Sequence, residues 1–300
     1  MASFLSRFTS QRATWVPIAV GSVAVAASLY YTNANKSPLA NETPVTFKGD
    51  DQWIDLKLVK SVEISPDTRH FYFALPSADH KSGLITASCL LAKYVTEKGN
   101  NVVRPYTPIS DVEQKGQLEF AIKRYPTGKF GNHLFSLKEN DTVSFKGPIV
   151  KWEWTPNQFE NVTLIGGGSG ITPLYQLLHE ITKNPEEKTK INLVYGNKTP
   201  GDILLKKDID SIAEKYSDRV KVHYFVDKAE GDWKGETGFI TKDWLNKNVP
   251  HPDASHQVFV CGPPPLYEAI SGNKVSPSDQ GELTGALKEL GFTKQNVFKF

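Results

Sequence analysis

Short alternating runs of apolar and polar residues dominate the chain from residue 45 to residue 150. In the clearest run, apolar residues at 54, 56 and 58 are separated by Asp55 and Lys57, and a Ser-Pro-Asp turn at 65–67 follows. Further strands are expected at 68–75, 88–95, 102–106, 118–124 and 142–147. Several short strands joined by turns predict an antiparallel β-barrel that closes on itself.

The pattern changes after a linker at 151–160, because apolar strands now alternate with amphipathic helices up to residue 300. Strands are expected at 162–166, 191–195, 220–225, 257–261 and 297–300, and helices at 173–182, 203–216, 241–247, 266–270 and 281–290. This alternation predicts a parallel, doubly wound α/β sheet, which binds ligands at the carboxyl ends of its strands. The chain is therefore expected to be an α+β protein with two domains, at 45–150 and 161–300.

The first 44 residues differ from both domains. Residues 1–41 contain no acidic residue but carry Arg7, Arg12 and Lys36, a composition typical of a mitochondrial targeting segment. The uncharged run at 15–31 has aromatic residues at both ends and predicts a single transmembrane anchor, followed by a tether up to residue 44. A secretory signal peptide is the alternative interpretation.

Charge and cysteine content exclude several classes of protein. The chain has 35 Lys and Arg against 33 Asp and Glu, so no overall charge favours nucleic acid as a partner. It has only two cysteines, Cys89 and Cys261, which argues against a disulfide framework or a structural metal site. We therefore expect no bound metal and no nucleic-acid partner.

The stretch Arg104-Pro105-Tyr106-Thr107-Pro108-Ile109-Ser110 combines a fixed cation, an aromatic ring and hydroxyl groups on an extended backbone. Its prolines remove backbone donors, which predicts an edge strand that runs into a turn. An Arg fork matches a phosphate group, and an adjacent Tyr can cover a ring or a ribose. The alternative is an ordinary barrel strand whose Arg pairs with a surface carboxylate.

Two glycine-bearing turns precede expected helices. Gly128-Lys129-Phe130-Gly131 leads into a short helix expected from Asn132, and Gly166-Gly167-Gly168-Ser169-Gly170-Ile171-Thr172-Pro173 follows the first parallel strand. Free backbone N–H groups at a helix start can hold phosphate groups, although the second turn lacks the standard dinucleotide spacing. A simple connecting turn is the alternative for the first. Cys261-Gly262-Pro263-Pro264-Pro265 places a thiol at a strand tip, where a structural buried cysteine is the alternative.

These four motifs, in this order, resemble the flavin and nicotinamide signatures of the NADH-cytochrome b5 reductases over residues 47–300. With the basic leader and the single anchor, the chain resembles the fungal mitochondrial form of that family. The resemblance implies an FAD-binding β-barrel followed by an NADH-binding α/β domain. It also implies that a hydride passes from NADH to FAD, and that electrons then pass singly to cytochrome b5 or a b5-like haem protein.

The resemblance carries over roles for individual residues. It places Thr107, Ser169 and Cys261 at the reacting rings. The implied FAD contacts are Arg104, Pro105, Tyr106, Thr107, Ile122, Lys123, Tyr125, Lys129, Phe130 and Gly131, and the implied NADH contacts are Gly167, Gly168, Ser169, Thr172, Pro173, Asp227, Cys261, Gly262 and Pro263. The family usually has Thr at the position of Ser169 and Ser or Thr at that of Gly131, so only the backbone contact of Gly131 is transferred.

The resemblance further implies a monomer on the mitochondrial outer membrane, with a cleaved soluble form in the intermembrane space. A basic rim for an acidic haem protein is expected from residues Lys123, Arg124, Lys129, Lys146 and Lys151, and a scattered solvated face is the alternative. Two other functions stay open on the sequence. One is a membrane-bound NAD(P)H flavin reductase that serves a quinone or an oxygenase component, and the other is a membrane-tethered binding protein that uses the flavin fold as a scaffold.

Overall fold

The structure is a computed structural model that describes residues 43–300. The predicted targeting segment and the predicted anchor at 15–31 lie outside the described residues. Between residues 43 and 300, the structure contains no helix with the length and apolar character needed to cross a membrane.

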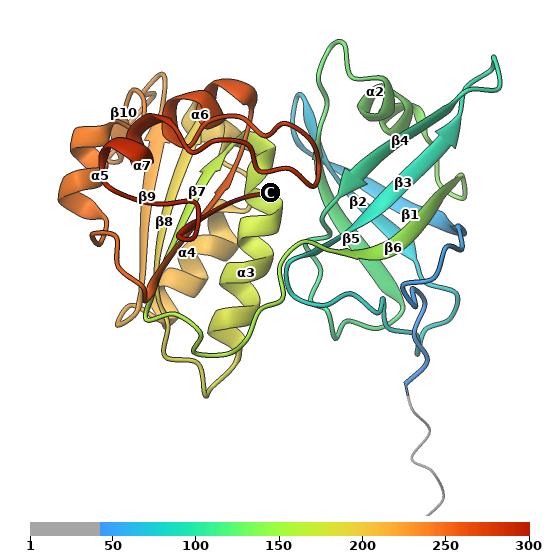
Figure 1. The fold of residues 1–300 in the computed structure, drawn as a ribbon. Coiled ribbons are helices and arrows are strands. Elements are labelled where there is room, and N and C mark those ends of the chain that lie inside the picture. Colours follow the sequence, from blue (N-terminus) through green and yellow to red (C-terminus); the bar gives the residue numbers. More distant parts are fainter. Residues whose placement is uncertain (1–42) are drawn as a thin grey trace, which may run out of the picture. The chain divides into compact units, whose positions relative to one another are not determined.

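The first sheet is antiparallel and has six strands in the order β4-β3-β6-β1-β2-β5 (Figure 1). Its strands are β1 (Ile54–Ser65), β2 (Thr68–Ala74), β3 (Ser88–Val95), β4 (Asn101–Tyr106), β5 (Gln117–Lys123) and β6 (Thr142–Val150), with helix α2 (Lys129–Ser136) between β5 and β6. Buried aromatic rings fill its centre, and Phe120 stacks on Phe145 with ring centroids 5.4 Å apart. The predicted antiparallel sheet is confirmed.

The prediction of a barrel closed by strand pairing is wrong at one seam. Strands β4 and β5 are the two edges of the sheet and form no ladder with each other. Just beyond β4, the Ile109 N–H donates to the Glu119 carbonyl of β5 at 2.8 Å, so a single backbone bond links the edges there. The physical reason is that Pro105 and Pro108 have no N–H to extend such a ladder.

The second sheet is parallel and has the order β10-β9-β8-β7-β11-β12, as the alternation of strands and helices predicted (Figure 1). Its strands are β7 (Asn161–Gly167), β8 (Lys190–Asn197), β9 (Val220–Val226), β10 (Glu236–Thr237), β11 (His256–Cys261) and β12 (Val297–Lys299). Helices α3 (Ile171–Lys183) and α4 (Lys206–Lys215) pack on one face, and α5 (Lys242–Asn248), α6 (Pro264–Ile270) and α7 (Gly285–Glu289) pack on the other. Strands covered on both faces read as nearly continuous apolar runs.

Two helices differ from their predicted extents. The helix expected at 203–216 starts only at Lys206, because Pro200–Asp202 forms a 3-10 turn (η2) and Leu205 has a left-handed φ of 57°. The helix expected at 281–290 is reduced to α7, because Gly281 and Gly285 have φ values of 65° and 68°. Left-handed residues cannot continue a right-handed helix, so both helices begin after them or at them.

Candidate functional site

Arg104 lies on the edge strand β4, as predicted, and its side chain is exposed. Its guanidinium Nη1 donates to the Val103 carbonyl at 2.7 Å, and it forms no ion pair with any residue of the described part of the chain. The alternative of an Arg held by a surface carboxylate is therefore not what the structure shows. A cation without a carboxylate partner can bind a phosphate group.

Tyr106 and Thr107 follow Arg104 at the end of the same strand. Tyr106 is half-buried and packs against the rings of Phe120 and Phe130, with centroids 6.3 and 5.5 Å away. Burial raises the pKa of Tyr106 to about 12, so the phenol is neutral at physiological pH. The Thr107 hydroxyl makes no hydrogen bond to any residue between 43 and 300 that could compete with a ligand. The strand end thus offers a fixed cation, a neutral ring and a free hydroxyl.

Helix α2 begins at Lys129, one turn earlier than the predicted start at Asn132. Its cap residue, Gly128, has no side chain to accept from the first backbone N–H groups, and Phe130 and Gly131 are buried in the first turn. Those N–H groups and the exposed Lys129 are the donors that an anion at this helix start would use. A Cβ on Gly131 would lie 3.6 Å from its nearest neighbour, the Arg124 Cα, so a side chain would fit there.

Strand β5 carries two residues predicted to line the cofactor. Ile122 is only 4% exposed and belongs to the barrel core, so its side chain is occupied and only its backbone, on the free edge of β5, can meet a ligand. Lys123 is also withdrawn from solvent, because its side chain is 9% exposed. Lys123 therefore does not belong to an exposed basic rim, which corrects that part of the prediction.

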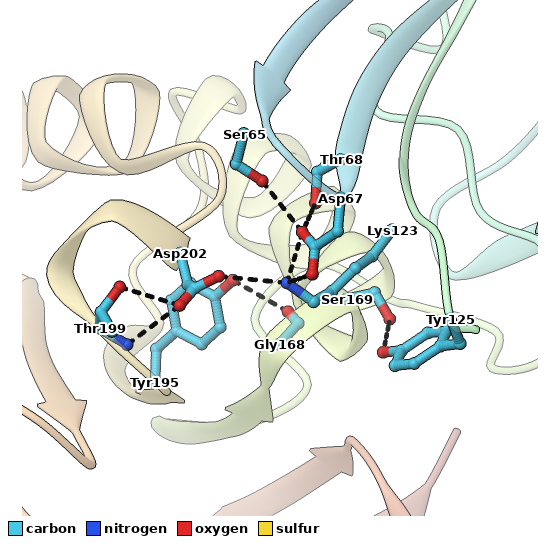
Figure 2. Close-up of polar contacts among 10 residues, drawn as sticks. All are labelled: Ser65, Asp67, Thr68, Lys123, Tyr125, Gly168, Ser169, Tyr195, Thr199 and Asp202. Carbon is cyan, nitrogen blue, oxygen red and sulfur yellow. Dashed lines mark hydrogen bonds and ion pairs between the residues drawn. The ribbon is translucent and has the colours of Figure 1, made fainter. Parts of the chain in front are cut away.

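Lys123 forms a bridge between the antiparallel and the parallel sheet (Figure 2). Its Nζ lies 2.7 Å from Asp67 Oδ2 and 3.2 Å from Asp202 Oδ1, so one ammonium joins the β1–β2 turn to the η2 turn. Burial by itself lowers the pKa of Lys123, but the hydrogen bonds to Asp67 and Asp202 outweigh it, so the pKa lies above its usual value. Lys123 is charged throughout the physiological range.

Both carboxylates of this bridge are held in place, and sequence reasoning missed both. Asp67 accepts from the hydroxyls of Ser65 and Thr68 at 3.0 Å each. Asp202 accepts from the backbone N–H and the hydroxyl of Thr199 at 3.1 and 2.9 Å. The sequence predicts only a turn at Asp67, and no local pattern pairs it with a lysine 56 positions later.

The glycine turn after β7 is built by close backbone contact. Gly168 has a φ of 52°, and the space at its missing side chain is open, whereas a Cβ on Gly170 would lie 2.2 Å from the Cys261 carbonyl oxygen. The Tyr195 hydroxyl donates to the Gly168 carbonyl at 2.9 Å and fixes the turn (Figure 2). The open side at Gly168 suits a ligand that approaches the backbone.

Helix α3 starts directly after this turn, with Gly170 as a cap residue without a side chain. The Thr172 hydroxyl donates to the Ser169 carbonyl at 3.4 Å, and Pro173 is the third residue of the helix rather than the first. The Ser169 hydroxyl lies 3.1 Å from the Tyr125 hydroxyl, so it also touches the segment that leads into α2 (Figure 2). The structure thus brings predicted residues from both sheets together.

Cys261 is the last residue of β11 and is partly exposed. Burial of its thiol raises the pKa of Cys261 to about 11, so the thiol is neutral at physiological pH. A Cβ on Gly167 would lie 3.0 Å from Pro263 Cδ, and one on Gly262 would lie 3.2 Å from the Gly167 nitrogen. The loops after β7 and β11 therefore form one surface, with Cys261 at its edge.

Asp227 lies one residue beyond β9 and is exposed, as predicted. Its N–H donates to the Asn197 carbonyl at 3.0 Å, which places it beside the end of β8. Two nearby residues were missed: the buried Asn197 amide has no partner in the described part of the chain, and Phe239 is 82% exposed. An exposed ring and an unpaired amide at the carboxyl edge of a parallel sheet fit a nucleotide base and its sugar.

Two domain families match the chain. The family described as "Oxidoreductase FAD-binding domain" matches residues 55–154, and the family described as "Oxidoreductase NAD-binding domain" matches residues 164–272. The donor sets above agree with this division, because Arg104 and the α2 start lie in the first range and the glycine turn and Cys261 lie in the second.

Relatives extend over nearly the whole chain. The NADH-cytochrome b5 reductase 2 of Meyerozyma guilliermondii is 60% identical, with 99% of each chain covered. The protein of the same name from Saccharomyces cerevisiae is 55% identical, with 98% of this chain and 99% of that protein covered. Among solved structures, the cytochrome b5 reductase domain of Ulva prolifera nitrate reductase is 29% identical with a TM-score of 0.74, covering 86% of this chain and all of that domain.

Proposed function

We propose a function from the premise that this chain belongs to the NADH-cytochrome b5 reductase family. The chain is an NADH-dependent FAD flavoprotein that passes electrons to cytochrome b5. FAD, when bound, supplies the conversion between the two-electron chemistry of NADH and the one-electron chemistry of a haem. Two contacts carry the proposal. Tyr106 of the Arg104 strand packs on Phe130 at the start of α2, and Tyr125, which leads into α2, contacts Ser169 of the glycine turn before α3.

The antiparallel sheet and helix α2 would hold FAD. The unpaired guanidinium of Arg104 and the backbone N–H groups at the α2 start would bind the pyrophosphate. The neutral ring of Tyr106 would cover the middle of the cofactor, and the free Thr107 hydroxyl would donate to the isoalloxazine. Among the described residues Arg104 has no carboxylate partner and the Thr107 hydroxyl has no hydrogen-bond partner, which is why the site fits an anionic, ring-bearing cofactor.

The parallel sheet and its helices would hold NADH. The open backbone at Gly168 and the first turn of α3 would bind its pyrophosphate, and Cys261 would lie beside the nicotinamide. The Asp227 carboxylate would accept from a ribose hydroxyl and repel a ribose phosphate, which favours NADH over NADPH. Lys198 directly follows β8, and its positive charge would instead favour a ribose phosphate. Kinetics with NADH and with NADPH measure which of the two effects prevails.

Thr107 and Cys261 are proposed to position the two rings rather than to move protons. The Cys261 thiol is neutral, so it offers a soft, uncharged surface beside the nicotinamide. We expect Thr107→Ala and Cys261→Ala to bind FAD normally but to reduce it more slowly with NADH in a stopped-flow experiment. Flavin reduction at the wild-type rate in both variants would remove this assignment.

The basic rim is proposed for Arg124, Lys129, Lys146 and Lys151, without Lys123; the Lys146 ammonium lies 2.8 Å from the exposed Asp51 carboxylate. Arg124 and Lys129 are exposed, and Lys151 is half-exposed. An acidic haem protein would be attracted by this rim, and its association rate would fall as salt is added. A rate of cytochrome b5 reduction that does not change between low and high ionic strength would contradict the rim.

The cellular place is also a proposal. The acid-free, basic leader at 1–41 and the uncharged run at 15–31 support an anchored monomer on the mitochondrial outer membrane, with a cleaved form in the intermembrane space. Alkaline extraction and protease protection of isolated mitochondria test the two forms, and light scattering tests the monomer.

One experiment tests the proposed function directly. The purified protein should be yellow and should bleach on addition of NADH without oxygen. It should then reduce cytochrome b5 faster than it reduces a quinone or an oxygenase component. A colourless protein that binds no FAD would reject the flavoprotein, and a preference for a quinone would reject the acceptor.

A further inference from the structure

A hollow lies at the amino edge of the parallel sheet, at the opposite ends of the strands from the glycine turn and Asp227. It has a volume of about 300 Å³ and lies between the starts of β7, β8 and β9 and the end of α5. Its lining residues are Asn161, Lys190, Ile191, Asn192, Asp218, Arg219, Lys221, Lys247, Asn248, Val249 and Pro250. No residue assigned to FAD or NADH lines it.

Strand register places three polar residues in one row under α5. Thr163 pairs with Asn192, and Asn192 pairs with Lys221, on neighbouring parallel strands. Two positions further along β7 and β8, Ile165 and Val194 lie in the core cluster that also contains α5 residues, and so does Phe225, four positions beyond Lys221 on β9. Because side chains alternate along a strand, the polar row faces the same side, where the hollow lies.

The hollow has an excess of positive charge. Its lining contains Lys190, Arg219, Lys221 and Lys247 but only one carboxylate, Asp218. Within residues 43–300, none of the three lysines forms an ion pair. Arg219 is held by the Thr182 carbonyl at 3.1 Å, so its charge is fixed nearby. Like charges that converge on a concave surface repel one another unless an anion lies between them.

Asn192 is a buried polar residue with unused hydrogen-bonding capacity. It is only 8% exposed, and its side-chain amide makes no hydrogen bond to any part of the chain that the structure describes. Its neighbour in the row, Thr163, is paired with His256 Nε2 at 2.9 Å. Asn192 lines the hollow, so its unpartnered amide is available to a ligand there.

We propose that this hollow binds the phosphate group of a small phosphate monoester. Lysines from three separate elements suit a compact anion with oxygens in several directions better than a carboxylate, which has only two oxygens. The Asn192 amide would donate to one phosphate oxygen, and the remaining volume would hold the organic part. The site stands on its own residues and does not depend on the proposed roles at the flavin.

Isothermal titration calorimetry at constant ionic strength tests the site. The sample is the full-length, FAD-loaded protein, and saturating NAD⁺ fills the nucleotide site. Inorganic phosphate, glycerol 3-phosphate and soluble dioctanoyl phosphatidylinositol 4-phosphate serve as probes. We expect saturable binding of at least one probe. A preference for glycerol 3-phosphate indicates a metabolite as the source of the phosphate, and a preference for the inositol lipid indicates a headgroup. Absence of binding by all three overturns the proposal.

Variants show whether the binding belongs to this hollow. Lys190→Gln combined with Lys221→Gln should weaken the affinity at least about tenfold, because charge-assisted hydrogen bonds are lost. Asn192→Asp keeps the side-chain shape and adds a negative charge, so it should weaken binding at least as much. Lys207→Gln, at an exposed lysine of α4, is the matched control and should bind like the wild type. Equal affinity in all variants would place the ligand elsewhere and overturn the proposal.

Discussion

The two helix starts of the site look alike in the sequence but are built differently. The start of α2 has room around its glycine, because a Cβ on Gly131 would meet nothing closer than 3.6 Å. The start of α3 has none at Gly170, because a Cβ there would lie 2.2 Å from the Cys261 carbonyl oxygen. Glycine at α2 thus leaves backbone donors open to a ligand, whereas glycine at α3 also lets two loops touch.

Gly170→Ala should produce the largest effect. The added Cβ collides with the backbone of Cys261 and Gly262, which cannot move aside as a flexible side chain can. We expect a loss of about 2 kcal/mol or more in unfolding free energy and a rise of about tenfold in the KM for NADH, with FAD content retained. Urea denaturation and steady-state kinetics measure these quantities.

Gly168→Ala is the matched control for that variant. Its backbone has a φ of 52°, but the space around the missing side chain is open. Only backbone strain is expected, at about 1 kcal/mol. Equal losses in the two variants would show that conformational strain, and not contact between the loops, explains the glycines.

Asp202→Asn tests the Lys123 bridge, which joins the β1–β2 turn and the end of β5 to the η2 turn. The change removes one of the two charges that hold Lys123 and leaves Asp67 in place. We expect a loss of about 1 kcal/mol in stability and a severalfold rise in the KM for NADH, with FAD content unchanged. Asp51→Asn removes an exposed ion pair with Lys146 and should change neither quantity. Similar changes in Asp202→Asn and Asp51→Asn would show that the Lys123 bridge contributes no more than an exposed ion pair.

Low pH should weaken the antiparallel sheet, because the titratable carboxyl of Glu119 lies on its edge strand β5. Contact with His70 holds the pKa of Glu119 at about 2, below its ordinary value of 4.5. A lowered carboxyl pKa stabilises the fold above the ordinary pKa, and that contribution is lost as the pH falls from about 4.5 towards 2. Urea midpoints between pH 6 and 3 should therefore fall less steeply in Glu119→Gln than in the wild type. Parallel curves for both proteins would contradict this coupling.

Gly131→Ser should produce the smallest effect. The side chain fits without moving the Arg124 backbone, and the N–H groups of the first turn stay in place. We expect FAD content and turnover within about twofold of the wild type, because backbone donors and not the side chain bind the anion. Loss of FAD from this variant would show that the two helix starts are equally intolerant of a side chain.

Much of the fold could be predicted from local pattern. Alternation of period two marked the antiparallel strands, and apolar strands separated by helices marked the parallel sheet. Errors arose where single residues interrupt a pattern, as at Leu205 and Gly285, whose left-handed backbone shortened two helices. Closure of the barrel was overestimated because the prolines beside Arg104 remove the donors that a β4–β5 ladder needs.

The sequence by itself determined the types of element, their order and the four motifs of the site, because each depends on residues close together in the chain. The tertiary structure alone decided which of those residues meet. Lys123 reaches Asp202 across 79 positions, and the loop at Gly170 rests against Cys261. Such contacts arise when two sheets pack and their loops touch. The free energy of that packing depends on residues far apart in the chain, so no local pattern predicts it.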